Sequence, residues 1–343
     1  MIFGAEAVAD VLMPAPRLAS LPLLALLAAS CGTSPRGAPD AGDAGDAGTE
    51  TGTDAAPWGS SQAPPLDLSP APAPPAPGSA AVAAPAPALR GLTCPRGMLA
   101  IEGRFCIDKW EASLIDRRTG LGLSPYYPPE RAAAAQVAAA WEKQRLEIGS
   151  DEARQIPIPA LPDWQRQREV EPVAVSRAGM VPNGYLSGLV AERACHNARK
   201  RLCRHEEWTL ACQGEQRRPF PYGAEYRPGA CNIFRALHPA LELHGNASVG
   251  HLDPRLNLVK EPSGDPLLRR TGGTPACRSA WGDDAAYDMN GNLDEWVEDD
   301  HGRFDGGFFS RSKRDGCASS VTAHPRTYYD YSTGARCCWS PGD

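Results

Sequence analysis

Several features that would point directly to a function are absent from this sequence. Its 35 lysines and arginines are outnumbered by 41 aspartates and glutamates, which gives a formal net charge of −6. A nucleic-acid-binding face is therefore not expected, because such faces need an excess of positive charge. No heptad pattern continues far enough to predict a coiled coil. The 11 cysteines include no C-x-x-C pair, a usual spacing of zinc thiolates.

The first 31 residues have the layout of an export signal. Arg17 precedes an apolar run at residues 21–27, and three small residues lead to Cys31. This order predicts a signal peptide, with a run too short to be read as a permanent spanning helix. Cys31 resembles the cysteine of a bacterial lipobox, so we expect it to be lipidated and the protein to be an outer-membrane lipoprotein. Ordinary cleavage near Ser30, giving a periplasmic or secreted protein, is the alternative.

Residues 32–90 are dominated by alanine, proline and glycine, with aspartate, serine and threonine between them. A segment with so little apolar surface does not offset the conformational entropy lost on folding, and its proline-rich part favours extended conformations. We interpret this stretch as a disordered tether; a proline-rich ligand for a partner is the alternative. The folded domain is expected at residues 91–343.

Helices are predicted inside that domain. Residues 129–148 begin with a proline, continue through alanines and end before Gly149, the order expected for a helix and its stop signal. Residues 188–200 place apolar side chains at helical spacing after Ser187, a suitable N-cap. A third, short helix is expected to carry Trp208.

Cysteine usage predicts structural disulfides. Apart from the lipobox cysteine, ten of the 11 remain, an even number in a chain expected to be exported. Cys94 and Cys106, brought close by a predicted hairpin, are the favoured pair, and Cys317 with Cys337 or Cys338 is the next. A zinc site is the alternative for one set of residues: Cys195, His196, Cys203, His205 and Cys212.

A short turn at residues 287–296 reads Y-D-M-N-G-N-L-D-E-W. It resembles the signature of the formylglycine-generating enzyme family, also called the sulfatase-modifying-factor family. Other segments resemble motifs of that family and follow its order along the chain: residues 94–98, 105–111, 172–176, 200–208, 221–223, 231–233, 306–307 and 334–338. The resemblance implies an α+β, C-type-lectin-like fold that is rich in disulfides and poor in regular secondary structure.

The same turn also suggests a structural metal. Asp288, Asn290, Asn292 and Glu295 offer oxygen atoms, which Ca²⁺ prefers as ligands. The family resemblance implies two sets of calcium ligands: Asp288, Gly291, Leu293 and Glu295 in the turn, and Asn232 with Ile233 in a second site. In the alternative, Asp288 and Asn292 cap turns and Glu295 forms a salt bridge with an arginine.

Active members of this family are understood to hold copper between two cysteines five residues apart and to use O₂ to convert a sulfatase cysteine into formylglycine. Here Cys317 matches the second cysteine, but Ser312 stands five residues before it, and a hydroxyl is a poor ligand for Cu(I). The iron-dependent branch of the family is disfavoured, because the seven histidines include no H-x-x-x-H pair.

These substitutions favour a binding or structural module at the cell surface over an enzyme. The expected partner is a peptide, a glycan or a protein ligand, with the membrane reached through the lipid anchor. The alternative is an O₂-dependent oxidoreductase that modifies a peptide cysteine. In that case Cys317 is catalytic, and Cys337 or Cys338 completes a copper pair.

Overall fold

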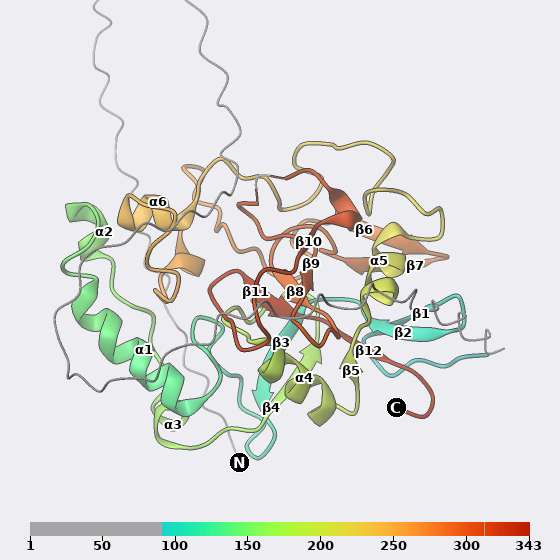
Figure 1. Ribbon diagram of the computed structural model, residues 1–343, viewed down its shortest axis with the longest axis horizontal. Coiled ribbons are helices and arrows are strands. Elements are labelled where there is room, and N and C mark those ends of the chain that lie inside the picture. The colour runs from blue at the N-terminus through green and yellow to red at the C-terminus, as the bar shows by residue number, and fades with distance from the viewer. Residues whose placement is uncertain (1–90, 312) are drawn as a thin grey trace, which may run out of the picture. The chain divides into compact units, whose positions relative to one another are not determined.

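The computed structural model describes residues 91–311 and 313–343. The predicted signal peptide, the lipidation site Cys31 and the tether lie outside the described residues, as does Ser312. Within the described chain, short strands and short helices alternate with long irregular connections (Figure 1). The predicted α+β fold with little regular secondary structure is confirmed.

The first four-stranded sheet has the order β1-β2-β12-β5. β1 (Met98–Ile101) and β2 (Phe105–Asp108) form the predicted hairpin. β12 (Cys337–Trp339) pairs antiparallel with β2 on one side and with β5 (Arg201–Leu202) on the other. A strand close to the C-terminus therefore lies in the interior of this sheet.

The second four-stranded sheet has the order β10-β9-β8-β11. Its strands are β10 (Ser320–Val321), β9 (Phe304–Asp305), β8 (Asp294–Trp296) and β11 (Thr333–Ala335). β8 pairs antiparallel with β9 and parallel with β11. Two antiparallel ladders complete the strands: β3 (Ala112–Asp116) with β4 (Pro172–Ser176), and β6 (Arg278–Trp281) with β7 (Asp284–Tyr287).

Three helices and two 3-10 turns belong to the part of the chain that follows β4. They are α4 (Gly188–Asn197), α5 (His205–Gln213), α6 (Pro239–His244), η1 (Leu256–Leu258) and η2 (Gly316–Ala318). The predicted N-cap of α4 is confirmed, because the Ser187 hydroxyl accepts a hydrogen bond of 3.3 Å from the backbone N–H of Val190. The predicted short helix carrying Trp208 is α5.

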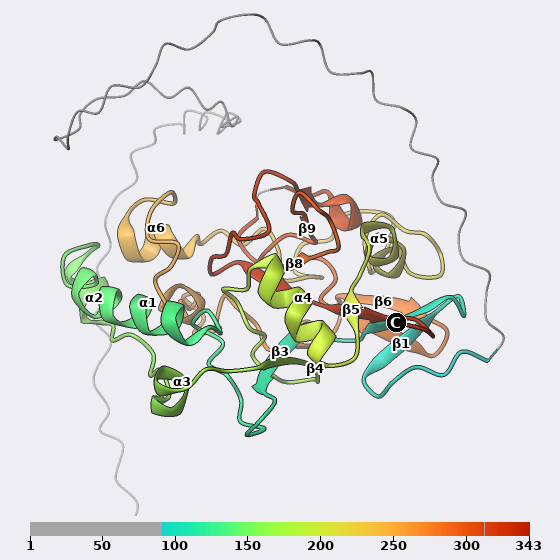
Figure 2. The ribbon, with the colours of Figure 1, turned by 60° about the horizontal axis from the view of Figure 1, so that its bottom comes forward.

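The connection between β3 and β4, residues 117–171, is called the insertion below. It contains α1 (Arg131–Gln144), which confirms the predicted helix with shorter ends, and the short helices α2 (Asp151–Gln155) and α3 (Asp163–Gln167). Figures 1 and 2 show these three helices on one side of the described chain, with α6 next to α2 and the β1–β2 hairpin on the other side.

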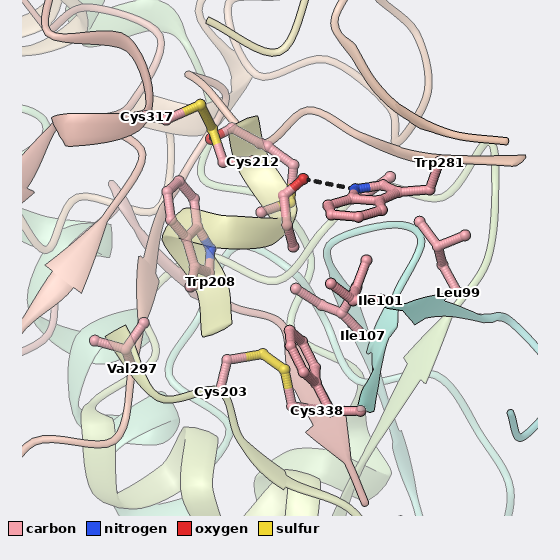
Figure 3. Close-up of a cluster of buried hydrophobic side chains, with 14 residues drawn as sticks. Leu99, Ile101, Ile107, Cys203, Trp208, Cys212, Trp281, Val297, Cys317 and Cys338 are labelled. Atoms are coloured by element: carbon pink, nitrogen blue, oxygen red, sulfur yellow. Dashed lines mark hydrogen bonds between the residues drawn. A yellow bond between two sulfur atoms is a disulfide. The ribbon is translucent and has the colours of Figure 1, made fainter. Parts of the chain in front are cut away.

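The core around α5 is built from aromatic rings and disulfides. Trp208 is fully buried and packs in one cluster with the Cys212–Cys317 and Cys203–Cys338 bridges (Figure 3). In the same cluster, the indole N–H of Trp281 donates a hydrogen bond of 3.1 Å to the backbone carbonyl of Ala211. This contact ties β6 to α5.

Five disulfides join all ten cysteines of the described residues: Cys94–Cys106, Cys195–Cys337, Cys203–Cys338, Cys212–Cys317 and Cys231–Cys277. The first of these is the pair that the sequence favoured. The cysteines proposed as zinc ligands, Cys195, Cys203 and Cys212, are all bridged, so they offer no thiolates to a metal in this oxidised form.

The prediction that Cys317 bonds to Cys337 or Cys338 is wrong. Neighbouring residues of a strand point to opposite faces of the sheet. On β12, one of the two cysteines reaches α4 and the other reaches the residue that follows β5. Cys317 lies instead on η2, which packs against α5 and brings it to Cys212.

Candidate functional site

The signature turn connects β7 to β8. Asp288 and Asn292 have positive φ angles of 58° and 66°, a region that aspartate and asparagine enter more readily than most residues. Gly291, with a φ of 95°, packs closely against the backbone of a second loop: a Cβ here would lie 2.3 Å from the carbonyl oxygen of Asn232. Only glycine fits this position, which explains the G-N step of the signature.

A buried ion pair lies directly beneath the turn. The guanidinium of Arg336 donates to both carboxylate oxygens of Glu295, with Nη2–Oε1 at 2.8 Å and Nε–Oε2 at 2.9 Å. The indole N–H of Trp208 donates to Oε2 of the same carboxylate at 2.7 Å. Such two-pronged, fully hydrogen-bonded geometry is what offsets the cost of burying two charges.

Arg336 also connects segments that lie far apart in the sequence. Its Nη1 donates to the backbone carbonyl of Asp108 at 2.8 Å, and its Nη2 to that of Tyr287 at 2.7 Å. The side chain therefore bridges β2, the start of the signature turn and β8. One residue on the segment between β11 and β12 thus fixes the position of the turn.

Two more carboxyl groups complete the polar cluster. Glu111 accepts hydrogen bonds from the Asn292 amide at 2.6 Å and from the backbone N–H of Leu293 at 3.1 Å. Asp288 accepts one from the backbone N–H of Gly272 at 2.6 Å. Burial raises the pKa of Glu111 well above its ordinary value, and the nearby charges of Asp288 and Glu295 raise it further. Burial also raises the pKa of Asp288 to about 7.

α5 presents two polar contacts to the strands beneath it. His205 and Trp208 lie three residues apart, so their side chains share one face of the helix. The His205 Nδ1 lies 2.8 Å from a carboxylate oxygen of Asp305 on β9, while Trp208 reaches Glu295 on the neighbouring strand β8. The hydrogen bond to Asp305 raises the pKa of His205.

A family model described as the sulfatase-modifying factor enzyme 1-like domain matches residues 163–335, half of the chain. The match includes the signature turn, α5 and Cys317. The chain belongs to the sulfatase-modifying-factor family. Residues 94–111, with the β1–β2 hairpin and Glu111, precede the matched region of this sulfatase-modifying-factor domain.

Comparison with solved structures gives loose overall similarities. The Major Tropism Determinant U1 variant has 13% sequence identity and a TM-score of 0.36, with 72% of this chain and 53% of that one covered. The chain thus spans about half the length of that protein. PvdO from Pseudomonas aeruginosa has 13% identity and a TM-score of 0.32, with 69% and 80% covered. CarF has 14% identity and a TM-score of 0.27, with 68% and 86% covered. No curated protein matches the sequence.

The predicted calcium ligands of the sulfatase-modifying-factor domain are largely bound to protein groups. Both oxygens of Glu295 are bonded to Arg336, the arginine contact that the sequence left open as the alternative. The carbonyl oxygen of the Asn232 side chain accepts a bond of 2.8 Å from Arg235 Nε, and its amide nitrogen donates to Leu267 and Asn292. Among the described residues, no group of three or more His, Cys, Asp and Glu side chains is arranged to hold a metal ion.

Calcium therefore remains a prediction that these contacts do not favour. The guanidinium of Arg336 already supplies positive charge to the Glu295 carboxylate, at the position where a cation was expected to bind. Gly291 and Leu293 lie in the turn where the family resemblance implies backbone ligands, and Ile233 follows Asn232 in the adjoining loop. In the turn, Gly291 and Leu293 would have to bind calcium with Asp288 and without Glu295 as long as the ion pair of Glu295 is intact.

The segment around Cys317, where the family resemblance implies a copper site, has no free thiolate from that cysteine. Cys317 is buried and bonded to Cys212, so no thiolate is present at its position. Nearby, Arg311 pairs with the buried carboxylate of Asp294, whose pKa is raised by burial to about 7 despite that cation. An ion pair and a disulfide thus stand in the region where a copper–thiolate centre was considered.

Several of these contacts were missed in the sequence. Arg336 lies within the motif at residues 334–338, but the sequence assigns it no partner, and no pattern singles out Asp305. The spacing of His205 and Trp208 on one helical face was a local signal for the two contacts of α5. The contacts of Glu111 and Arg336 had no such signal, because each joins segments far apart in the chain.

Proposed function

We propose that this protein is an exported, lipid-anchored ligand-binding module of the sulfatase-modifying-factor family, and not a formylglycine-generating oxidase. The observation that carries this proposal is the bond between Cys317 and Cys212. Soft Cu(I) needs thiolate ligands, and a disulfide supplies none. Ser312, five residues before Cys317, replaces the other cysteine of the copper pair.

Export is supported by the disulfides of the domain, and anchoring by the lipobox-like position of Cys31. Five disulfides in one domain are typical of proteins that fold in an oxidising compartment. No helix among the described residues has the length and apolarity needed to cross a membrane. A lipid on Cys31 would place the domain at the membrane surface, where it would meet a peptide, a glycan or a protein ligand.

The decisive experiment is peptide mapping of the purified protein after alkylation without reduction. We expect five bridged pairs in the domain and no alkylated cysteine. The same preparation should show no tight Cu(I) binding and should leave a sulfatase-derived cysteine peptide unchanged. Alkylation of Cys317, together with formylglycine formation that Cys317→Ser abolishes, would overturn the proposal and establish the oxidoreductase alternative.

Anchoring is tested by metabolic labelling with a radioactive fatty acid in a bacterial host. The wild-type chain should carry the label and remain in the membrane fraction. The Cys31→Ser variant should lose both. A Cys31→Ser protein that remains labelled would rule out this cysteine as the anchor.

A further inference from the structure

A groove of about 660 Å³ lies beside β4. It is lined by β4 itself, by the loop at residues 95–97, by residues 109–110 after β2 and by the segment after α4. Its volume falls within the roughly 300–1,000 Å³ that is usual for small-molecule sites. The walls at residues 95–97 and 109–110 precede the region matched by the family model.

The groove is positively charged in a chain whose net charge is −6. Four basic residues line it, Arg96, Lys109, Arg177 and Lys200, and the described lining residues include no aspartate or glutamate. The two lysines are paired with acids outside the groove: Lys109 with Asp284 and Lys200 with Asp108, each at 2.5 Å.

The two arginines have no such compensation. Arg96 and Arg177 are exposed, and neither forms an ion pair within residues 91–311 and 313–343. A guanidinium offers a planar fork of N–H donors that matches a carboxylate or phosphate group. The groove therefore presents two unneutralised forks to an anionic ligand.

The walls that carry these arginines are held rigidly. The Ser176 hydroxyl donates to the Gly97 carbonyl and accepts from the Trp110 backbone N–H, both at 3.1 Å, so one side chain joins three walls. The Cys94–Cys106 bridge clamps the loop beside Arg96. Such preorganisation lowers the entropic cost of binding.

The groove also contains a flat apolar surface. Trp110 lines it and is held in place by stacking on Tyr287, with ring centroids 6.1 Å apart and an interplanar angle of 9°. The side chains that β4 contributes, such as Val173 and Val175, are small and mostly apolar. The site thus combines oxyanion donors with an aromatic surface suited to a ring.

We propose that this groove binds an acidic glycan that contains uronic acid units, with Arg96 and Arg177 binding its carboxylates and Trp110 contacting a sugar ring. This inference rests on the proposed function as a ligand-binding module and names its ligand class. A nucleic acid is a poorer fit, because its dense phosphates call for more free cations than two. The Asp and Glu side chains of an acidic peptide would use the arginines but carry no ring to place on Trp110.

The test is calorimetric titration of the purified full chain with oligogalacturonate. We expect binding that weakens as salt is raised. Arg96→Gln and Arg177→Gln should each weaken it about tenfold, the loss expected for one charged hydrogen-bonding contact. Arg154→Gln, which removes the same charge from α2 in the insertion, is the matched control and should bind like the wild type. Thermal melting checks that all three variants fold.

Three ligands define the specificity. A neutral maltooligosaccharide of equal length, oligoglutamate and inorganic phosphate should each bind much more weakly than oligogalacturonate. Equal binding of the neutral sugar would overturn the role of the arginines, and equal binding of oligoglutamate or phosphate would overturn the role of the sugar ring. Unchanged binding by both arginine variants would place the glycan outside this groove and overturn the proposal.

The same preparation distinguishes a failure of this inference from a failure of the proposed function. If its ten domain cysteines are bridged and it leaves the cysteine peptide unchanged, but the arginine variants bind like the wild type, only the groove assignment fails. If it makes formylglycine, the proposed function fails, whatever the groove binds.

Discussion

The insertion and the rest of the described domain, which we call the body, are stabilised in different ways. The insertion, residues 117–171, contains no cysteine, whereas the body contains all five disulfides. The insertion packs around a small apolar cluster that contains Tyr127 and Trp141, and its Leu123 and Ala153 join two clusters of the body. Polar contacts also tie it to the loop that follows α6. The body is therefore held by covalent crosslinks as well as packing, whereas the insertion has no covalent support of its own.

The polar contact that docks the insertion is short and buried. Arg255 pairs with Asp253 at 2.7 Å and donates to the backbone carbonyl of Ala153, in the middle of α2, at 2.6 Å. His244 lies 3.2 Å from Asp253 and packs near Trp141, with ring centroids 5.3 Å apart. Gly149 allows close approach here, because a Cβ would lie 1.8 Å from the Leu243 carbonyl oxygen. The two regions should therefore respond to different perturbations.

The largest expected effect comes from the crosslink of the body that closes the longest independent loop. Cys195–Cys337 and Cys203–Cys338 span more residues, but each closes nearly the same loop as the other. The longest loop that no other bridge shortens is that of Cys231–Cys277, separated by 46 residues. Changing both of these cysteines to alanine should lower the free energy of unfolding by about 4 kcal/mol, because the unfolded chain then gains the most freedom. Removing Cys94–Cys106, separated by 12 residues, is the matched control and should cost about 3 kcal/mol. Urea denaturation measures both, and equal losses would contradict the dependence on loop length.

Next in size is the ion pair under the signature turn. Arg336→Gln leaves Glu295 buried without its cation and should cost about 3–5 kcal/mol in urea denaturation. The double variant Glu295→Gln with Arg336→Met removes both charges and should recover a large part of that loss. A cost for Arg336→Gln below about 1 kcal/mol would show that the pair is not intact in solution.

The insertion should unfold locally when its apolar cluster is disrupted. Trp141→Ala removes a nearly buried ring and should cost about 3 kcal/mol. Hydrogen exchange should show that amides of α1 and α2 lose protection while those of β1 and β2 keep theirs. Leu146→Ala, which changes a side chain that is 55% exposed, should change stability by less than about 0.5 kcal/mol. Equal loss of protection in β1 and β2 would show that the two regions unfold together.

A smaller effect should depend on pH. The hydrogen bond to Asp305 raises the pKa of His205 above its ordinary value of 6.5. The contribution of this contact is therefore complete below that ordinary value and is lost as the pH rises through the folded-state pKa. His205→Asn should destabilise the protein by less than about 1 kcal/mol, and more at pH 5.5 than at pH 9 when melting is compared. The exposed His301→Asn is the control, and a reversed pH trend would contradict the Asp305 contact.

The smallest expected effect is that of calcium. Because Glu295 is bonded to Arg336 and the Asn232 side chain to Arg235, adding CaCl₂ or EDTA should leave the melting temperature unchanged. Differential scanning calorimetry of the full chain measures this directly. A rise of several degrees with CaCl₂ that MgCl₂ does not reproduce would restore the calcium site implied by the family resemblance.

Local patterns in the sequence predicted local structure well. Ser187 indicated the start of α4, the apolar repeat near residue 100 indicated the β1–β2 hairpin, and the signature turn indicated the fold. Contacts between residues far apart in the sequence were not predicted. The bond of Cys317 to Cys212 depends on η2 packing against α5, and the contact of Glu111 with Asn292 joins residues that are 181 apart. Neither contact can be predicted from the periodicity of the sequence or from the spacing of its motifs.

The position of β12 sets an order on the assembly of the molecule. A ribosome releases the chain from its N-terminus, so β1, β2 and β5 emerge well before residues 337–339, which separate β2 from β5 in the sheet. Until then, Cys195 and Cys203 have no native partners and Arg336 is not available to Glu295. The sheet closes only after residues 337–339 have been made. Synthesis that stops shortly before Cys337 would therefore yield a chain without its central strand, two of its crosslinks and the cation beneath its signature turn.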